Sequence, residues 1–175
     1  MIEMLIVIGL FIILLPTIFA ILSTILRQQL RMYKIVEAKR QGDAAMAFMK
    51  EKILRDGVSI TSNTGSQCFD ASPPNNQYTT SDGRWFRIFN ESGTSYYNFY
   101  QSAGGQINYY ESNLNITAAL TANTVRVTNF QISCFRRSLN SPPMIQISYT
   151  VTSTDNTATI SLPYKTKVRL LSSSP

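Results

Sequence analysis

The sequence of 175 residues contains no histidine and only two cysteines. Without histidine, neither a Ser-His-Asp nor a Cys-His catalytic site can form within this chain. A zinc site would have to combine both cysteines with carboxylates. The sequence also lacks a Gly-x-Ser-x-Gly turn and a phosphate-cradling glycine-rich loop. These absences argue against an enzyme, and we expect no catalytic residues, no metal and no cofactor.

Charge is absent between Glu3 and Arg27. The 23 residues from Met4 to Leu26 are almost all apolar. The hydrocarbon core of a bilayer is about 30 Å thick, and a helix needs roughly 20 apolar residues to cross it. We therefore expect residues 1–26 to form a membrane-spanning half of a helix.

Pro16 is the only proline before Pro73. The predicted helix therefore continues from Glu3 to Arg55, over about 80 Å at 1.5 Å per residue. Gly57 suits the left-handed turn that ends a helix. Because Pro16 cannot donate a backbone hydrogen bond, we predict a kink or local melting there, with a weaker flexible point at Gly42.

The second half of the predicted helix carries an apolar stripe at helical spacing, which should cover a sheet. The stripe consists of Ala45, Phe48, Met49 and Ile53. We therefore divide the chain into residues 1–26 in the membrane, residues 27–56 packed on the sheet, and a β-rich globular domain at residues 57–175.

Alternating apolar residues and turn sequences predict an antiparallel sheet after the helix. The predicted strands are residues 58–61, 84–89, 94–100, 106–111, 125–134, 145–151 and 158–164. A change of apolar parity between Val127 and Phe130 predicts a bulge near Asn129 and places Cys134 on the inward face. Residues 62–83, rich in Ser, Thr, Asn, Gly and Pro, are predicted to form a long loop. The expected fold class is α+β, a long N-terminal helix against an antiparallel sheet.

The net charge is +6, and eight of the sixteen basic residues lie between Arg27 and Arg55. Such a stretch suits a solvated or headgroup-facing helix surface, and it leaves a nucleic-acid partner open. Because basic residues follow the apolar run and none precedes it, the positive-inside rule places the C-terminal domain in the cytoplasm.

Nine aromatic residues also bear on a nucleic-acid partner. They are Trp85, Phe86, Phe89, Tyr96, Tyr97, Phe99, Tyr100, Tyr109 and Tyr110. Exposed aromatic rings can stack on bases. Packing in the core and across strands accounts for most aromatic residues of a sheet, so the aromatic content alone does not indicate nucleic-acid binding.

The residues around Glu3 carry a resemblance to a known family. The N-terminal sequence Met1-Ile2-Glu3-Met4-Leu5-Ile6-Val7-Ile8-Gly9 resembles the start of type IV pilins and type II secretion pseudopilins, whose signature is Gly-Phe-Thr-Leu-Ile-Glu before an apolar helix. In that family the glutamate faces the free N-terminal amine of a neighbouring subunit, and Glu3 is the matching position. The alternative is that Glu3 lies at the lipid headgroups, where the helix dipole favours a negative charge in the first turn.

The long helix followed by a β-rich domain also resembles J-type minor pseudopilins and minor pilins. The resemblance implies a minor or tip subunit of a type IV pilus or type II secretion pseudopilus, which binds other pilin or pseudopilin subunits through its N-terminal helix. It also implies a prepilin peptidase and an inner-membrane assembly platform as partners. The protein would cross the cytoplasmic membrane once, with its C-terminal domain outside the cytoplasm, and would enter a periplasmic or extracellular filament.

The family has a basic leader peptide ahead of the position where Met1 stands. An in-frame basic leader ending in Gly-Phe-Thr upstream of Met1 would support the family and would remove the conflict with the positive-inside rule, whereas its absence would weaken the resemblance. Two other functions remain open. The first alternative is a tip subunit that binds a substrate or DNA. The second is a single-pass anchored domain unrelated to filaments.

The two cysteines, Cys68 and Cys134, lie in the predicted globular domain and are expected to form a disulfide in an oxidising compartment. The alternative is two unrelated buried thiols. Since the bridge closes a long loop, Cys134→Ala should lower the free energy of unfolding by roughly 4 kcal/mol. Denaturant unfolding with and without reductant measures this loss. Free-thiol labelling of both cysteines in the native exported protein would contradict the bridge.

Overall fold

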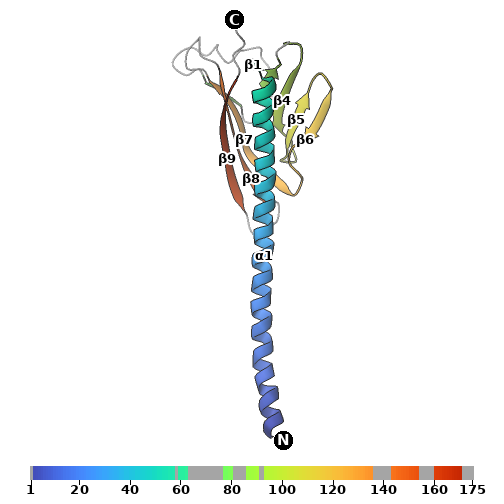
Figure 1. Ribbon diagram of the computed structural model, residues 1–175, viewed down its shortest axis with the longest axis vertical. Coiled ribbons are helices and arrows are strands. Elements are labelled where there is room, and N and C mark those ends of the chain that lie inside the picture. The colour runs from blue at the N-terminus through green and yellow to red at the C-terminus, as the bar shows by residue number, and fades with distance from the viewer. Residues whose placement is uncertain are drawn as a thin grey trace. The chain divides into compact units, whose positions relative to one another are not determined.

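The computed structural model describes residues 2–57, 59–62, 77–80, 86–90, 93–135, 143–153 and 160–170. The chain forms two compact units, Met1–Glu37 and Ala38–Pro175. The helix α1 spans Ile2–Asp56 (Figure 1). The strands are β1 (Ser59–Ser62), β2 (Gln77–Thr80), β3 (Phe86–Phe89), β4 (Tyr96–Gln101), β5 (Ile107–Glu111), β6 (Ile116–Ala119), β7 (Val125–Phe135), β8 (Met144–Ser153) and β9 (Ser161–Arg169). The predicted α+β fold class is confirmed.

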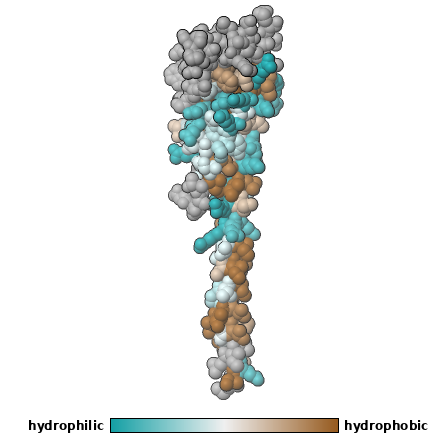
Figure 2. Space-filling model, turned by 90° about the vertical axis from the view of Figure 1, so that its left-hand side faces the viewer, coloured by the Kyte–Doolittle hydropathy of each residue, from teal (hydrophilic) through white to brown (hydrophobic). Residues whose placement is uncertain are grey.

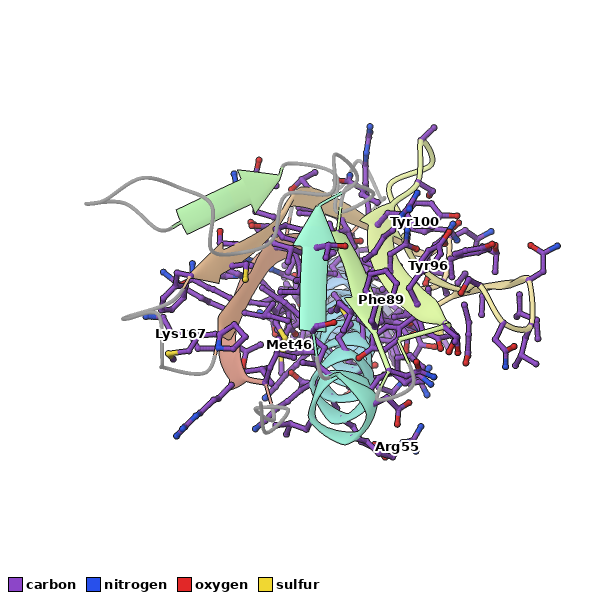
Figure 3. The ribbon with its side chains drawn as sticks, turned by 90° about the horizontal axis from the view of Figure 1, so that it is seen from above. Met46, Arg55, Phe89, Tyr96, Tyr100 and Lys167 are labelled. Carbon is purple, nitrogen blue, oxygen red and sulfur yellow. The ribbon has the colours of Figure 1, made fainter. Side chains whose placement is uncertain are left out.

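The strands form two antiparallel sheets, where the sequence predicted one. The five-stranded sheet has the order β1-β3-β4-β5-β6, and the four-stranded sheet has the order β2-β7-β8-β9. Figures 1 and 3 show the two sheets on either side of the C-terminal part of α1. This part of the helix therefore contributes to a core that both sheets share.

The two sheets are also joined directly, at the turn between β4 and β5. The backbone N–H of Val127 donates to the carbonyl of Gly105 at 2.6 Å, and the side-chain amide of Gln101 donates to the carbonyl of Val127 at 2.6 Å. Gly105 has a φ of +77°, a conformation that favours glycine. The turn between β4 and β5 therefore holds one end of the five-stranded sheet against β7.

Two strands were missed by the sequence analysis. The stretch 62–83 was predicted to be a loop, but Gln77–Thr80 forms β2 and pairs with β7. Residues Ile116–Ala119 form β6 on the edge of the five-stranded sheet, and all four are exposed. Both are short edge strands whose sequences do not alternate apolar and polar residues, so pairing with a neighbour, rather than local pattern, decides their conformation.

The bulge predicted near Asn129 is confirmed. The register between β7 and β8 shifts between Thr128 and Gln131, and Asn129 has a φ of +54°. The extra residue lets the apolar side chains on both sides of the bulge face the core. Cys134 is fully buried, as expected, and is disulfide-bonded. Cys68 lies outside the described residues.

Among the described residues of α1, Ala38 is the first that is buried, and Ile35 before it is half-buried. The predicted boundary at residue 27 stays a prediction. Ala45, Met49 and Ile53 are at most 1% exposed and belong to the core. Phe48 is 39% exposed, so it lies at the rim of the core and not within it. Residues four apart follow one line along a helix, whereas Phe48 lies beside that line.

Phe48 still contacts a sheet, because its ring packs edge-on against Tyr109 of β5 with the ring centroids 5.4 Å apart. The side chain therefore covers the rim of the core, where it remains accessible to water.

Three tyrosine hydroxyls donate hydrogen bonds to backbone carbonyls of α1. The pairs are Tyr164 to Lys39 at 3.1 Å, Tyr149 to Gly42 at 2.8 Å and Tyr97 to Lys52 at 3.1 Å. A carbonyl oxygen has two lone pairs, so each can accept this bond and still accept the bond of the helix. We call these three contacts the tyrosine clamps. The first two come from the four-stranded sheet and the third comes from the five-stranded sheet.

The clamps place Gly42 directly against the ring of Tyr164. A Cβ atom on Gly42 would overlap the ring carbons and hydroxyl oxygen of Tyr164, which itself stacks on Tyr149 with centroids 5.2 Å apart. Burial raises the pKa of Tyr164 to about 12, so the hydroxyl stays protonated and able to donate. α1 remains helical through Gly42, and the flexible point predicted there stays a prediction.

Near the end of α1, Lys52 lies in the junction with the five-stranded sheet. Its Nζ is 2.7 Å from a carboxylate oxygen of Asp56 and 3.8 Å from one of Glu111. The same Nζ lies 5.4 Å and 5.6 Å from the ring centroids of Tyr97 and Tyr109. The ammonium group is thus neutralised by carboxylates and covered by aromatic faces.

The charges of this junction stabilise each other. Burial alone would raise the pKa of Asp56, but the hydrogen bonds and positive charges of Arg55 and Lys52 lower it below its ordinary value. Asp56 therefore remains a carboxylate at neutral pH, where it fixes Lys52 at the last turn of the helix.

Phe48 at the rim of the core and Met49 within it give a matched pair of substitutions. A fragment that begins near residue 28 is expected to be soluble and monomeric. In this fragment Met49→Asp should prevent folding, because an unpaired buried charge costs several kcal/mol. Phe48→Asp should cost only about 1–2 kcal/mol, the loss of one rim contact. Urea unfolding followed by circular dichroism measures both, and equal losses would place Phe48 in the core.

Gly42→Ala tests the close approach of Tyr164. In a helix without this contact, the change would stabilise by about 1 kcal/mol through helix propensity. We expect the opposite sign, a loss of about 1–3 kcal/mol, because the methyl group overpacks the contact. The control is Gly104→Ala, whose Cβ would meet only one side-chain atom, at 3.7 Å. A stabilised Gly42→Ala protein would show that Tyr164 does not hold the helix.

Candidate membrane-spanning and assembly segment

The first unit of the chain exposes large apolar side chains on every face of α1. Those described between Ile2 and Leu26 are 43–75% exposed. By length and composition this part of α1 can cross a membrane, and none of its apolar stretch is buried within the chain. Apolar side chains are also evident along this part of the helix in Figure 2. Exposed apolar surface on this scale needs lipid or other protein to cover it.

The hydroxyl groups within the apolar stretch are satisfied by the helix itself. Thr17 donates to the carbonyl of Leu14 at 2.8 Å, and Ser23 and Thr24 each donate to the carbonyl of Ala20 at 2.9 Å. A hydroxyl that is hydrogen-bonded to its own helix costs little in hydrocarbon. These polar residues are therefore compatible with a membrane span.

Pro16 lies inside α1, which is helical on both sides of it. Proline removes one backbone hydrogen bond, and the neighbouring turns keep the helical geometry. The local melting predicted at Pro16 is therefore not observed, and the kink stays a prediction.

Glu3 lies in the first turn of α1, and its side chain is exposed. The helix dipole favours a carboxylate at this position. This placement is compatible with both interpretations of Glu3, as a headgroup-level charge and as a partner for a neighbouring amine.

Beyond the apolar stretch, basic and apolar side chains alternate along the helix. Arg27 and Arg31 are exposed one turn apart. Between and after them lie four large apolar side chains that are 59–71% exposed. They are Leu30, Met32, Tyr33 and Val36. The sequence analysis missed this feature, although spacing of three and four residues in a charged stretch was the available signal. The exposed apolar surface thus continues past the predicted end of the membrane span.

The structure separates the aromatic residues that were considered for base stacking. Phe86, Tyr97, Phe99 and Tyr109 point into the core and are buried. Phe89, Tyr96, Tyr100 and Tyr110 are half-buried on the outer face of the five-stranded sheet. Figure 3 shows Phe89, Tyr96 and Tyr100 on this side. The ring centroids of Tyr96 lie 5.8 Å from Phe89 and 6.2 Å from Tyr110, so these rings mainly pack on each other. Trp85 lies outside the described residues.

Within the described part of the chain, no three His, Cys, Asp or Glu side chains gather in a way that could hold a metal ion. Comparisons of the chain with models of protein families, with curated proteins and with solved structures found no match. The function has to be argued from the residues and their arrangement.

Proposed function

We propose that this protein is a structural subunit, minor or at the tip, of a filament of the type IV pilus or type II secretion pseudopilus kind. It joins the filament by packing the first part of α1 against the corresponding helices of neighbouring subunits. Two features support the proposal. The first is the resemblance of the residues around Glu3 to the family signature, and the second is the extent of exposed apolar surface on α1.

The extent of that surface carries the proposal. An anchor needs roughly 20 apolar residues, and the 23 residues from Met4 to Leu26 supply them. The exposed apolar side chains nevertheless continue to Val36, nine residues beyond the first cation at Arg27. Lipid cannot cover both these side chains and the charges beside them without cost. A neighbouring helix can cover both, because its own surface offers apolar side chains next to polar ones.

Glu3 supports the same interpretation. In a packed bundle of helices a carboxylate needs a cation nearby, since an isolated charge in a low-dielectric interior is unfavourable. The N-terminal amine of a neighbouring subunit would supply that cation. By the resemblance, the subunit is processed by a prepilin peptidase, crosses the cytoplasmic membrane once and carries its globular unit outside the cytoplasm.

Glu3→Leu separates assembly from anchoring. If Glu3 neutralises a neighbour's amine, its loss leaves that amine unpaired at a cost of about 3–5 kcal/mol, which lowers incorporation a hundredfold or more. We therefore expect the Glu3→Leu protein to accumulate normally in the membrane and to be missing from filaments. Immunoblots of membrane and sheared-filament fractions measure both pools.

Two further variants sharpen this experiment. Glu3→Asp keeps the carboxylate and should retain most assembly. Leu30→Gln/Tyr33→Gln leaves the membrane span intact and should reduce incorporation without reducing membrane accumulation. Equal recovery of all variants in the filament fraction would dismiss the assembly role and leave α1 as a simple anchor.

A further inference from the structure

The outer face of the four-stranded sheet carries a row of cations along β9. Lys165, Lys167 and Arg169 are exposed and alternate with side chains that face the core. Successive outward residues of a strand are about 6.8 Å apart, so the row spans roughly 14 Å. Figure 3 shows Lys167 on the side of this sheet away from α1. The four strands of the sheet contain no aspartate or glutamate.

Beside Lys165 this face is hollowed into a groove of about 230 Å³. Its polar lining includes Asn129, Gln131, Ser148, Thr150 and Lys165. Gln131, Ser148 and Lys165 are cross-strand neighbours on β7, β8 and β9, so they form one row across the sheet. The groove lies at the bulge of β7, where Asn129 has its positive φ. Strained residues and bulges are concentrated at functional sites.

The groove and the row together have the chemistry of a phosphate-binding surface. An ammonium group, two side-chain amides and two hydroxyls can all donate to phosphate oxygens, and no carboxylate from the strands of this sheet repels the phosphate. Charges and proline on an edge strand also discourage pairing with other sheets. Charges of either sign would prevent such pairing, so this role does not explain why all three charges are positive. It also does not explain the groove.

We propose that this face binds the phosphodiester backbone of nucleic acid, with one phosphate in the groove at Lys165 and the next ones along Lys167 and Arg169. A linear polyanion fits better than a lipid headgroup because the cations lie in a line along one strand. The aromatic ring of Phe135 lies under Lys167, with Nζ 5.5 Å from the centroid, and is therefore covered from bases. Binding should be independent of base sequence.

The experiment uses the full chain in a neutral detergent and a fluorescein-labelled duplex of about 30 base pairs, with anisotropy followed from about 50 to 200 mM salt. Loss of three phosphate contacts lowers the slope of log K against log salt by about 2–3. Lys165→Gln/Lys167→Gln/Arg169→Gln should show this change and a loss of affinity of about 50-fold or more at 0.1 M salt. The charge-conserving Lys165→Arg/Lys167→Arg/Arg169→Lys protein should bind like the wild type.

The matched control is Arg31→Gln/Lys39→Gln/Lys50→Gln, which removes the same charge from exposed positions of α1. An equal loss in this control would overturn the proposal, because net charge alone would then explain binding. Absence of duplex binding by the wild type would also overturn it. So would equal or tighter binding to polyglutamate, or binding to phosphatidylserine vesicles in place of DNA. The proposal does not depend on filament assembly, and it is tested on unassembled protein.

If the triple variant unfolds, Lys165→Gln and Lys167→Gln are measured singly. Each should lower the salt slope by about 0.9. An unchanged slope in both would refute the assignment.

Discussion

The globular unit depends on one helix segment, Ala38–Asp56, that two sheets share. Both sheets contribute buried apolar side chains to the core that contains Ala45, Met49 and Ile53 of this segment. The tyrosine clamps fix the segment at both ends, because Tyr149 and Tyr164 donate near its start and Tyr97 donates near its end. A hydroxyl that donates to a carbonyl does so only within a narrow range of oxygen–oxygen distances. The clamps therefore fix the position of the helix along its axis, which apolar contacts alone would leave free to slide.

This arrangement gives α1 two surfaces with different requirements. From Ala38 onward one face of the helix, which includes Ala45, Met49 and Ile53, is buried in the core of the same chain. Before that residue, large apolar side chains such as Phe19, Leu26 and Tyr33 are exposed, and such surface needs lipid or another protein to cover it. The boundary between the two units is thus a change in what covers the helix, while the helix itself continues without a break. The proposed assembly role requires such a division, because assembly needs apolar surface that the chain itself leaves uncovered.

Much of this fold follows from periodicity in the sequence. β7, β8 and β9 alternate clearly because one face of their sheet is buried and the other is wet, and the same rule located the bulge at Asn129. The sequences of β2 and β6 show no such alternation of apolar and polar residues, so nothing local marks them as strands. The close contact between Gly42 and Tyr164 could not be predicted, because Tyr164 lies more than a hundred residues later in the chain. The apolar stretch of α1 was predictable because a helix that can cross a bilayer needs a long run of apolar residues, which is visible in the sequence.

The groove could not be predicted from sequence, because Gln131, Ser148 and Lys165 meet only through the register of three strands. Core and groove nevertheless have the same cause. Without the extra residue in β7, apolar side chains on one side of the bulge would face water. Burying both sets requires a local bend, and that bend leaves the outer face hollow beside Lys165. The packing of the interior therefore determines where this surface can receive a ligand, and a change that removed the bulge would remove the groove and part of the core together.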